Sequence, residues 1–84
     1  MENVTRIKET LRINTLTDIK DFHAIICSLE TPVILRRGNF MCEATSLLGI
    51  FAMDTSIPFE VEYDIREQKF DRYITQFRVW LNEI

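Results

Sequence analysis

The residues of this sequence that most readily do chemistry are one histidine, His23, and two cysteines, Cys27 and Cys42. A zinc site in a protein needs about four ligands, and its Cys and His ligands usually come in closely spaced pairs. The two cysteines form no such pair, and the sequence has no second histidine. We therefore expect no metal site and no cofactor. In a cytosolic protein we expect two free, mostly buried thiols.

The sequence also lacks the patterns of other catalytic sites. It contains no Gly-rich phosphate loop and no arrangement that pairs a nucleophile with a base. His23 has no carboxylate close in sequence that would clearly orient its ring, so we expect a histidine on the shoulder of a helix without a role. The sequence therefore predicts no catalytic residue and no enzyme.

Composition limits the class of protein and its partners. The chain has 84 residues, 46% hydrophobic and 27% charged, and its net charge of −3 comes from interspersed acids and bases. These values are typical of one small globular domain, here 1–84, and offer no basic surface for nucleic acid or an anionic membrane. No apolar run reaches the roughly 20 residues of a membrane span, and the first residues do not resemble a signal peptide. We expect a cytoplasmic protein.

Residue patterns predict the first strand and the first helix. Residues 5–14 alternate between apolar and polar side chains, with Glu9 the exception on the apolar side. Thr15 followed three residues later by Asp18 is typical of a helix start, so we expect a helix from about Thr17. Its apolar stripe recurs at three, four and three residues: Ile19, Phe22, Ile26 and Leu29.

The rest of the chain predicts three more strands and a long final helix. Residues 32–37 and 40–44 flank Gly38-Asn39, a pair typical of tight hairpins, and residues 59–63 alternate with two glutamates in a fourth strand. From about Arg66 to the end, apolar residues recur at helical spacing: Phe70, Tyr73, Ile74, Phe77, Leu81 and Ile84, with Trp80 at the edge. The order β-α-β-β-α-β-α predicts an α+β fold whose helices cover one face of a mostly antiparallel sheet.

The stretch 46–53 raises a question of exposure. Ser46 fits a helix N-cap, and only about two turns follow it, rich in large apolar residues. So short a helix cannot bury side chains that point in most directions. Helical geometry indicates that Leu47, Leu48 and Phe51 face solvent while Ile50 and Met53 turn inward: an exposed patch of this kind usually binds a partner. Gly49 would allow another strand or chain to approach closely.

The serine, two apolar residues, glycine and apolar residue from Ser46 to Ile50 resemble the start of the second helix of HPr. HPr is the small phosphocarrier of the bacterial sugar phosphotransferase system. The element order agrees over nearly the whole chain. The resemblance implies an HPr-like open-faced β-sandwich, with a four-stranded antiparallel sheet and three helices on one face.

The chain departs from the HPr pattern at the site of phosphoryl transfer. HPr proteins carry the phosphoryl group on a histidine between the first strand and the first helix, followed by an arginine and a proline. The corresponding loop here is Asn14, Thr15, Leu16 and Thr17, which has none of the three. A threonine ester lacks the transfer potential of a phosphohistidine, so the resemblance implies a degenerate member without the phosphoacceptor.

Ser46 aligns with the serine that a kinase phosphorylates in HPr of some bacteria. A phosphate is electrostatically acceptable at a helix N-terminus, so Ser46 is a candidate regulatory site as well as a plain N-cap. His23 lies in the middle of its predicted helix, and we do not expect it to be a displaced acceptor.

These observations leave four functions open. We expect a non-catalytic HPr-like interaction or regulatory module that docks through the short helix 46–53. Its protein partner would be a phosphotransferase component or a transcriptional regulator. The alternatives are a phosphocarrier with an unrecognised acceptor, an enzyme, and a domain that forms a homodimer through the same surface.

Overall fold

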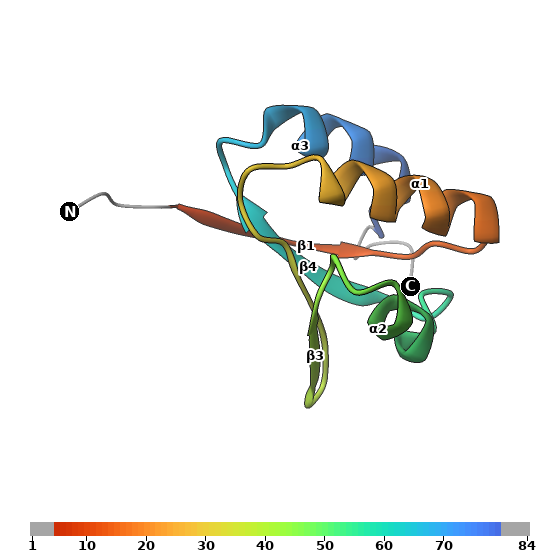
Figure 1. Cartoon of the computed structure of the whole chain (residues 1–84). Helices are drawn as coiled ribbons and strands as arrows, with labels where there is room; N and C mark the ends of the chain where they lie inside the picture. The colour runs from red at the N-terminus through yellow and green to blue at the C-terminus, as the bar shows by residue number, and fades with distance from the viewer. Residues whose placement is uncertain (1–4, 80–84) are drawn as a thin grey trace.

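The computed structural model describes residues 5–79 of the chain. Over this range the fold is an α+β open-faced sandwich, with a four-stranded sheet and helices packed on it (Figure 1). The elements in chain order are β1 (Arg6–Leu11), α1 (Leu16–Cys27), β2 (Ile34–Arg37), β3 (Phe40–Glu43), α2 (Leu47–Met53), β4 (Phe59–Asp64), α3 (Gln68–Ile74) and the 3-10 turn Thr75–Phe77. The order β-α-β-β-α-β-α predicted from the sequence is confirmed.

The sheet has the strand order β1-β4-β2-β3, and every neighbouring pair is antiparallel. β4 pairs with β1 along its whole length, from Arg6 opposite Asp64 to Leu11 opposite Phe59. The β2–β3 hairpin turns at Gly38, whose φ of 58° lies in the left-handed region that glycine enters without steric cost. The hairpin predicted from Gly38-Asn39 is therefore present.

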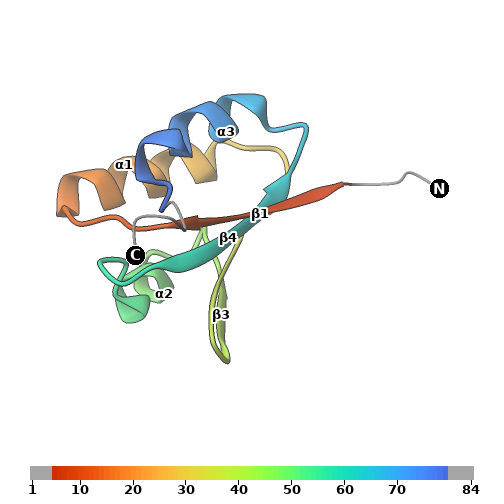
Figure 2. The same cartoon turned by 180° about the vertical axis from the view of Figure 1, so that it is seen from behind.

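Helices cover one face of the sheet. α1 and α3 lie side by side over β1 and β4, while α2 lies by the β2–β3 hairpin (Figures 1 and 2). Side chains from all three helices and from the strands pack into one hydrophobic core. The core residues are Leu11, Ile13, Phe22, Ile26, Val33, Leu35, Ala44, Ile50, Met53, Phe59, Val61, Tyr63, Phe70 and Ile74. The opposite face of the sheet carries charged side chains, among them Glu62, which pairs with Arg6 and Arg36.

Four aromatic rings form the centre of this core. Phe22 of α1 packs edge-on against Phe59 of β4, with ring centroids 6.3 Å apart. Phe70 of α3 lies 5.9 Å from Phe22 and 5.1 Å from Tyr63, again edge-on to the tyrosine. Edge-on pairs contribute about 0.5–1.5 kcal/mol each beyond the area they bury. These contacts hold α1 and α3 against the same strand.

α1 begins one residue earlier than the sequence pattern indicates. Its N-cap is Thr15, whose hydroxyl oxygen accepts from the Asp18 N–H at 3.1 Å, and its first helical residue is Leu16. The predicted stripe faces the sheet: Phe22 and Ile26 are buried, and Ile19 and Leu29 pack against the core. The cap of the predicted capping box is thus confirmed.

The prediction of one long helix from Arg66 to the end is wrong over the described residues. α3 ends at Ile74, and after the 3-10 turn the backbone is extended at Arg78. The Arg12 N–H donates to the Phe77 carbonyl at 3.0 Å, and the Val79 N–H donates to the Thr10 carbonyl at 2.9 Å. Pairing with the edge of β1 therefore replaces helical hydrogen bonds. Trp80, Leu81 and Ile84 lie outside the described residues.

The segment after α3 also explains why a charged residue, Glu9, lies on the apolar side of β1. Glu9 is opposite Val61 and so shares its side of the sheet, where a carboxylate needs a partner. Arg78 supplies one, with its Nε 3.4 Å from a Glu9 carboxylate oxygen and its Nη2 2.8 Å from Asp71. The contact joins residues far apart in sequence, so the strand pattern alone did not predict it.

Candidate functional site

The predicted docking helix α2 is held by side chains at both ends. At its start, Ser46 is the N-cap, and its hydroxyl accepts from the Gly49 N–H at 3.1 Å, as the sequence predicts. At its end, the Arg37 guanidinium of β2 donates to the carbonyl of Met53 and, at 3.0 Å, to that of Asp54. Both contacts satisfy backbone groups that a helix terminus leaves unpaired. Nothing in the sequence indicated that Arg37 caps a helix sixteen residues away.

The faces of α2 are distributed largely as predicted. Ile50 and Met53 are buried against the core, whereas Leu48 is 82% exposed and Phe51 is 46% exposed. Leu47, the third predicted contact residue, is half-buried. We call Leu47, Leu48 and Phe51 the α2 patch. Full burial of such a side chain contributes about 1.5–3 kcal/mol, so most of this contribution is missing at Leu48 and about half of it at Phe51.

Gly49 brings α2 close to the sheet. A Cβ at this position would lie 3.2 Å from Cβ and Sγ of Cys42 on β3, and 3.2 Å from the Ser46 hydroxyl oxygen. A larger residue would push the helix away from the strand or displace the cap. The predicted close approach at Gly49 is therefore made by β3, a strand of the same chain.

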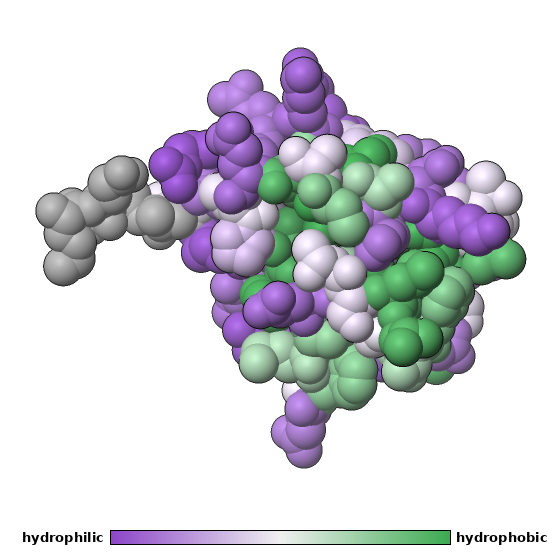
Figure 3. All heavy atoms as spheres, in the orientation of Figure 1, coloured by the Kyte–Doolittle hydropathy of each residue, from purple (hydrophilic) through white to green (hydrophobic). Residues whose placement is uncertain are grey.

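The α2 patch continues towards the start of α1. A hollow lies between these two helices and is lined by Asn14, Ile19, Phe51 and Asp54, among others. Leu16, in the first turn of α1, is 54% exposed. Figure 3 shows hydrophobic surface on the side of the molecule where α2 and the start of α1 lie. The exposure of Leu16 adds this residue to the apolar surface, which the sequence does not predict.

The loop Asn14–Thr17 therefore borders the predicted docking helix. Of its four residues, Asn14 lines the hollow, Thr15 caps α1, and Leu16 and Thr17 are exposed. The Thr15 hydroxyl is engaged with the backbone of α1. The loop Asn14–Thr17 and the helix α2, which are far apart in sequence, thus lie next to each other in the fold.

His23 connects α1 with the residue before the N-cap of α2. Its Nε2 lies 3.0 Å from the Thr45 carbonyl oxygen and 3.5 Å from Cys27 Sγ. A carbonyl oxygen can only accept, so Nε2 carries the hydrogen in the contact with Thr45. The predicted position on the shoulder of the helix is correct, since His23 is half-buried.

The expectation that both thiols are mostly buried is wrong for Cys27. Cys27 is the last residue of α1 and is exposed, while Cys42 is half-buried beside α2. Burial raises the pKa of the Cys42 thiol above its ordinary value. The helical pattern places Cys27 next to the apolar stripe but does not show that no element covers it there.

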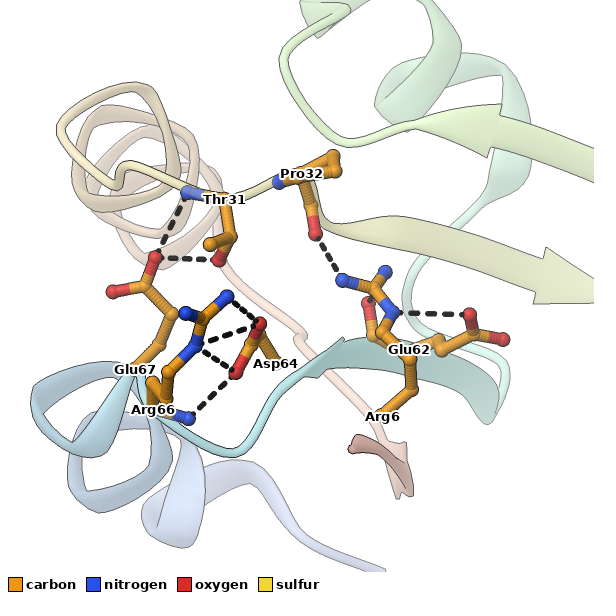
Figure 4. A network of polar contacts seen from close by, with 7 residues as sticks. All are labelled: Arg6, Thr31, Pro32, Glu62, Asp64, Arg66 and Glu67. Atoms are coloured by element: carbon orange, nitrogen blue, oxygen red, sulfur yellow. Dashed lines mark hydrogen bonds and ion pairs between the residues drawn. The ribbon is translucent and has the colours of Figure 1, made fainter. Parts of the chain in front are cut away.

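A separate polar network lies at the other end of the molecule and connects the loop after α1, β1 and the start of α3 (Figure 4). The Glu67 carboxylate accepts from the Thr31 N–H at 3.0 Å and from its hydroxyl at 2.6 Å. Buried Asp64 accepts from the backbone N–H and the guanidinium of Arg66, at 2.8 and 2.7 Å. On β1, Arg6 donates to the Pro32 carbonyl at 2.9 Å. These contacts tie the loop after α1 to β1 and to the start of α3, which is a structural role.

A second polar cluster is partly buried between β4, α3 and the segment that follows α3. The Tyr63 hydroxyl donates to Asp71, which also pairs with Arg78. Burial, followed by the hydrogen bond to Asp71, raises the pKa of Tyr63 far above its ordinary value. The hydroxyl therefore stays protonated, and the cluster anchors the segment after α3 and does not supply a base.

A groove lies between the end of α1 and the start of α3. Its lining includes Glu30 and Glu67 beside Lys69 and Arg72. Charges of both signs face it, and Glu67 is already bound to Thr31. The groove therefore has no single chemical preference that would define a ligand.

Comparisons with known proteins identify no relative. No family model, curated protein or solved structure matches the chain. Within residues 5–79 no three or more His, Cys, Asp and Glu side chains gather as metal ligands. No helix in the same range is long and apolar enough to cross a membrane. The case for a function therefore depends on the geometry of the site.

We predict that Asp64 makes the protein sensitive to acid. Hydrogen bonds from Arg66 hold the pKa of Asp64 below its ordinary value. A carboxyl whose pKa is lower in the folded than in the unfolded chain adds stability above about pH 4, and this stability is lost as pH falls through the folded pKa. Urea unfolding below about pH 4 should show a shallower loss in Asp64→Asn than in the native protein.

Arg66→Gln serves as the matched variant for this prediction. It removes the guanidinium donors to Asp64 but keeps the backbone N–H donor, so its pH dependence should lie between the other two. An unchanged slope in Asp64→Asn would show that the acid sensitivity comes from another group.

Proposed function

We propose that this protein is a non-catalytic HPr-like interaction module of the sugar phosphotransferase system. It docks onto a protein partner through the short helix 46–53. The observation that carries the proposal is the outward apolar face of α2, with Leu48 82% exposed and Phe51 46% exposed on a helix held at both ends. The partner is a phosphotransferase component, with a transcriptional regulator as the second candidate.

The shape of the patch is suited to recognition. Leu48 and Phe51 project from one short helix, and Leu16 of α1 extends the apolar surface. Ser46 and Arg37 fix the helix ends, so little backbone ordering is needed on binding. Aromatic and large apolar anchors at the centre of an interface usually dominate its affinity. The α2 patch has both kinds of anchor.

The proposal excludes phosphoryl transfer because the loop Asn14–Thr17 offers no imidazole. The Thr15 hydroxyl caps α1, and His23, the single histidine of the chain, is hydrogen-bonded to the Thr45 carbonyl. Ser46 is exposed, and its hydroxyl oxygen serves the cap. Phosphorylation of Ser46 would place a dianion next to the docking helix and so regulate the same surface.

Two alternatives use the same region. A phosphocarrier with an unrecognised acceptor would need a nucleophile within reach of the partner's phosphohistidine. A homodimer would cover Leu48 and Phe51 with a second copy across a two-fold axis, which is the usual symmetry of self-associating surfaces.

We predict that Leu48→Asp weakens binding to Enzyme I, the phosphotransferase component that phosphorylates HPr, by at least about tenfold. Burial of a leucine contributes about 1.5–3 kcal/mol, and 1.4 kcal/mol corresponds to a factor of ten. The fold should be unaffected, because Leu48 is 82% exposed. Isothermal titration calorimetry measures the affinity, and urea unfolding measures the stability.

Ile65→Asp is the matched control for this experiment. Ile65 is 49% exposed and directly follows β4, at the end opposite to α2, so its replacement should leave binding unchanged. Equal affinities for the native protein and Leu48→Asp would contradict the proposal. A native protein that sediments as a dimer, and as a monomer only in Leu48→Asp, would favour the homodimer.

We also predict that the protein gains no acid-labile phosphate. Incubation with Enzyme I and phosphoenolpyruvate, followed by intact mass measurement before and after brief acid treatment, should leave the mass unchanged. An acid-labile gain of one phosphate would identify an unrecognised acceptor and reject the non-catalytic module. His23→Gln would then show whether the imidazole is that acceptor.

A further inference from the structure

The hollow between α2 and the start of α1 has an apolar floor. Ile13 and Ile50 are almost fully buried there, and Ile19 is half-buried beside them. The exposed ring of Phe51 forms part of the wall. The volume of the hollow is about 310 Å³. Pockets for drug-sized ligands span about 300–1,000 Å³, so this hollow is at the small end and has room for one large side chain.

Reciprocal hydrogen bonds fix the two sides of the hollow relative to each other. The Ile13 N–H donates to the Thr55 carbonyl at 2.8 Å, and the Thr55 hydroxyl donates to the Ile13 carbonyl at 3.0 Å. These two contacts join the chain that leaves β1 to the loop that follows α2. A binding partner therefore meets a preformed surface, which lowers the entropy cost of binding.

Polar groups at the rim of the hollow already have partners within the chain. The Asp54 carboxylate accepts from the Ser56 N–H at 3.2 Å and from the Ser56 hydroxyl at 2.6 Å. The Thr55 hydroxyl is bound to the Ile13 carbonyl. A buried polar group without a partner would oppose binding. Since these groups keep their partners, an apolar group can enter without that penalty.

Charge further limits the kind of occupant. Among the described residues that line the hollow, Asp54 alone carries a charge. Hydrogen bonds from Ser56 hold the pKa of the Asp54 carboxyl below its ordinary value, so this group is ionised at neutral pH. A fixed negative charge repels an anionic ligand such as phosphate and an acidic residue of a partner. The hollow therefore favours an uncharged group, with a neutral or basic residue beside it.

We propose that the hollow receives one large apolar side chain of the protein partner, an aromatic ring that packs against Phe51. The inference rests on the proposed function for the identity of the partner, Enzyme I, and adds the chemistry of the contact. Leu48 projects from α2 into the partner, while the ring of the partner enters the chain between α1 and α2. Aromatic anchors that fill a pocket usually dominate the affinity of an interface.

Toluene is the probe for this site, because it carries the ring of a phenylalanine side chain and needs no partner protein. Titration of the full-length protein with toluene, followed in methyl spectra, should shift the signals of Ile13, Ile19 and Ile50 until they saturate. The signals of Ile65, at the end of the molecule opposite to α2, should remain unchanged.

Asn14→Phe should abolish these shifts. Asn14 is exposed at the rim, so a ring at this position can fill the hollow while the fold stays intact, which urea unfolding checks. The same variant should weaken binding to Enzyme I by at least about tenfold, because the anchor of the partner loses its pocket. Isothermal titration calorimetry measures this affinity.

Asn14→Ala is the matched control, since it changes the same residue but leaves the hollow open. It should retain the toluene shifts and the affinity for Enzyme I. The proposal is overturned if toluene leaves the three isoleucine signals unchanged, or if Asn14→Phe binds Enzyme I as tightly as the native protein. Saturable toluene shifts in a protein that Enzyme I does not bind would support the hollow as a site for an apolar ring and would overturn the proposed function.

Discussion

The fold depends on covering the one apolar face of its sheet. β1, β4 and β2 turn Leu11, Val61 and Leu35 to the same side, where they are fully buried. α1 and α3 cover β1 and β4, and the aromatic cluster lies between them. α2 covers the end of the sheet formed by β2 and β3. Seven residues make two turns, which is enough to insert Ile50 and Met53 but not to bury every apolar side chain of that helix. The exposed patch follows from this constraint.

The same constraint makes the patch rigid. A helix of two turns is not stable in isolation, so α2 needs contacts outside itself. Ser46 and Arg37 satisfy its two ends, and Gly49 lets it approach Cys42 of β3. The helix is therefore fixed by the sheet, and Leu48 projects from a defined position. A preformed apolar anchor loses little conformational entropy on binding, which favours a docking role.

Much of this could be predicted from the sequence because the signals are local. Thr15 and Ser46 act on N–H groups three residues away, and Gly38 turns a hairpin between adjacent strands. The errors concern contacts between distant residues. The last helix ends early because residues 77–79 pair with β1, and the Arg37 cap reaches across the fold. The exposure of Cys27 likewise depends on which elements surround α1, which no local pattern shows.

Backbone amide spectra of isotope-labelled protein during titration with Enzyme I would show directly which surface binds the partner. If the protein docks through α2, the shifts are concentrated in residues 46–53 and in the first turn of α1, because these segments carry Leu48, Phe51 and Leu16. The amides of β4 and of the Asp64–Glu67 turn should remain unchanged. Shifts confined to the outer face of the sheet, or no shifts at a saturating excess, would contradict docking through α2.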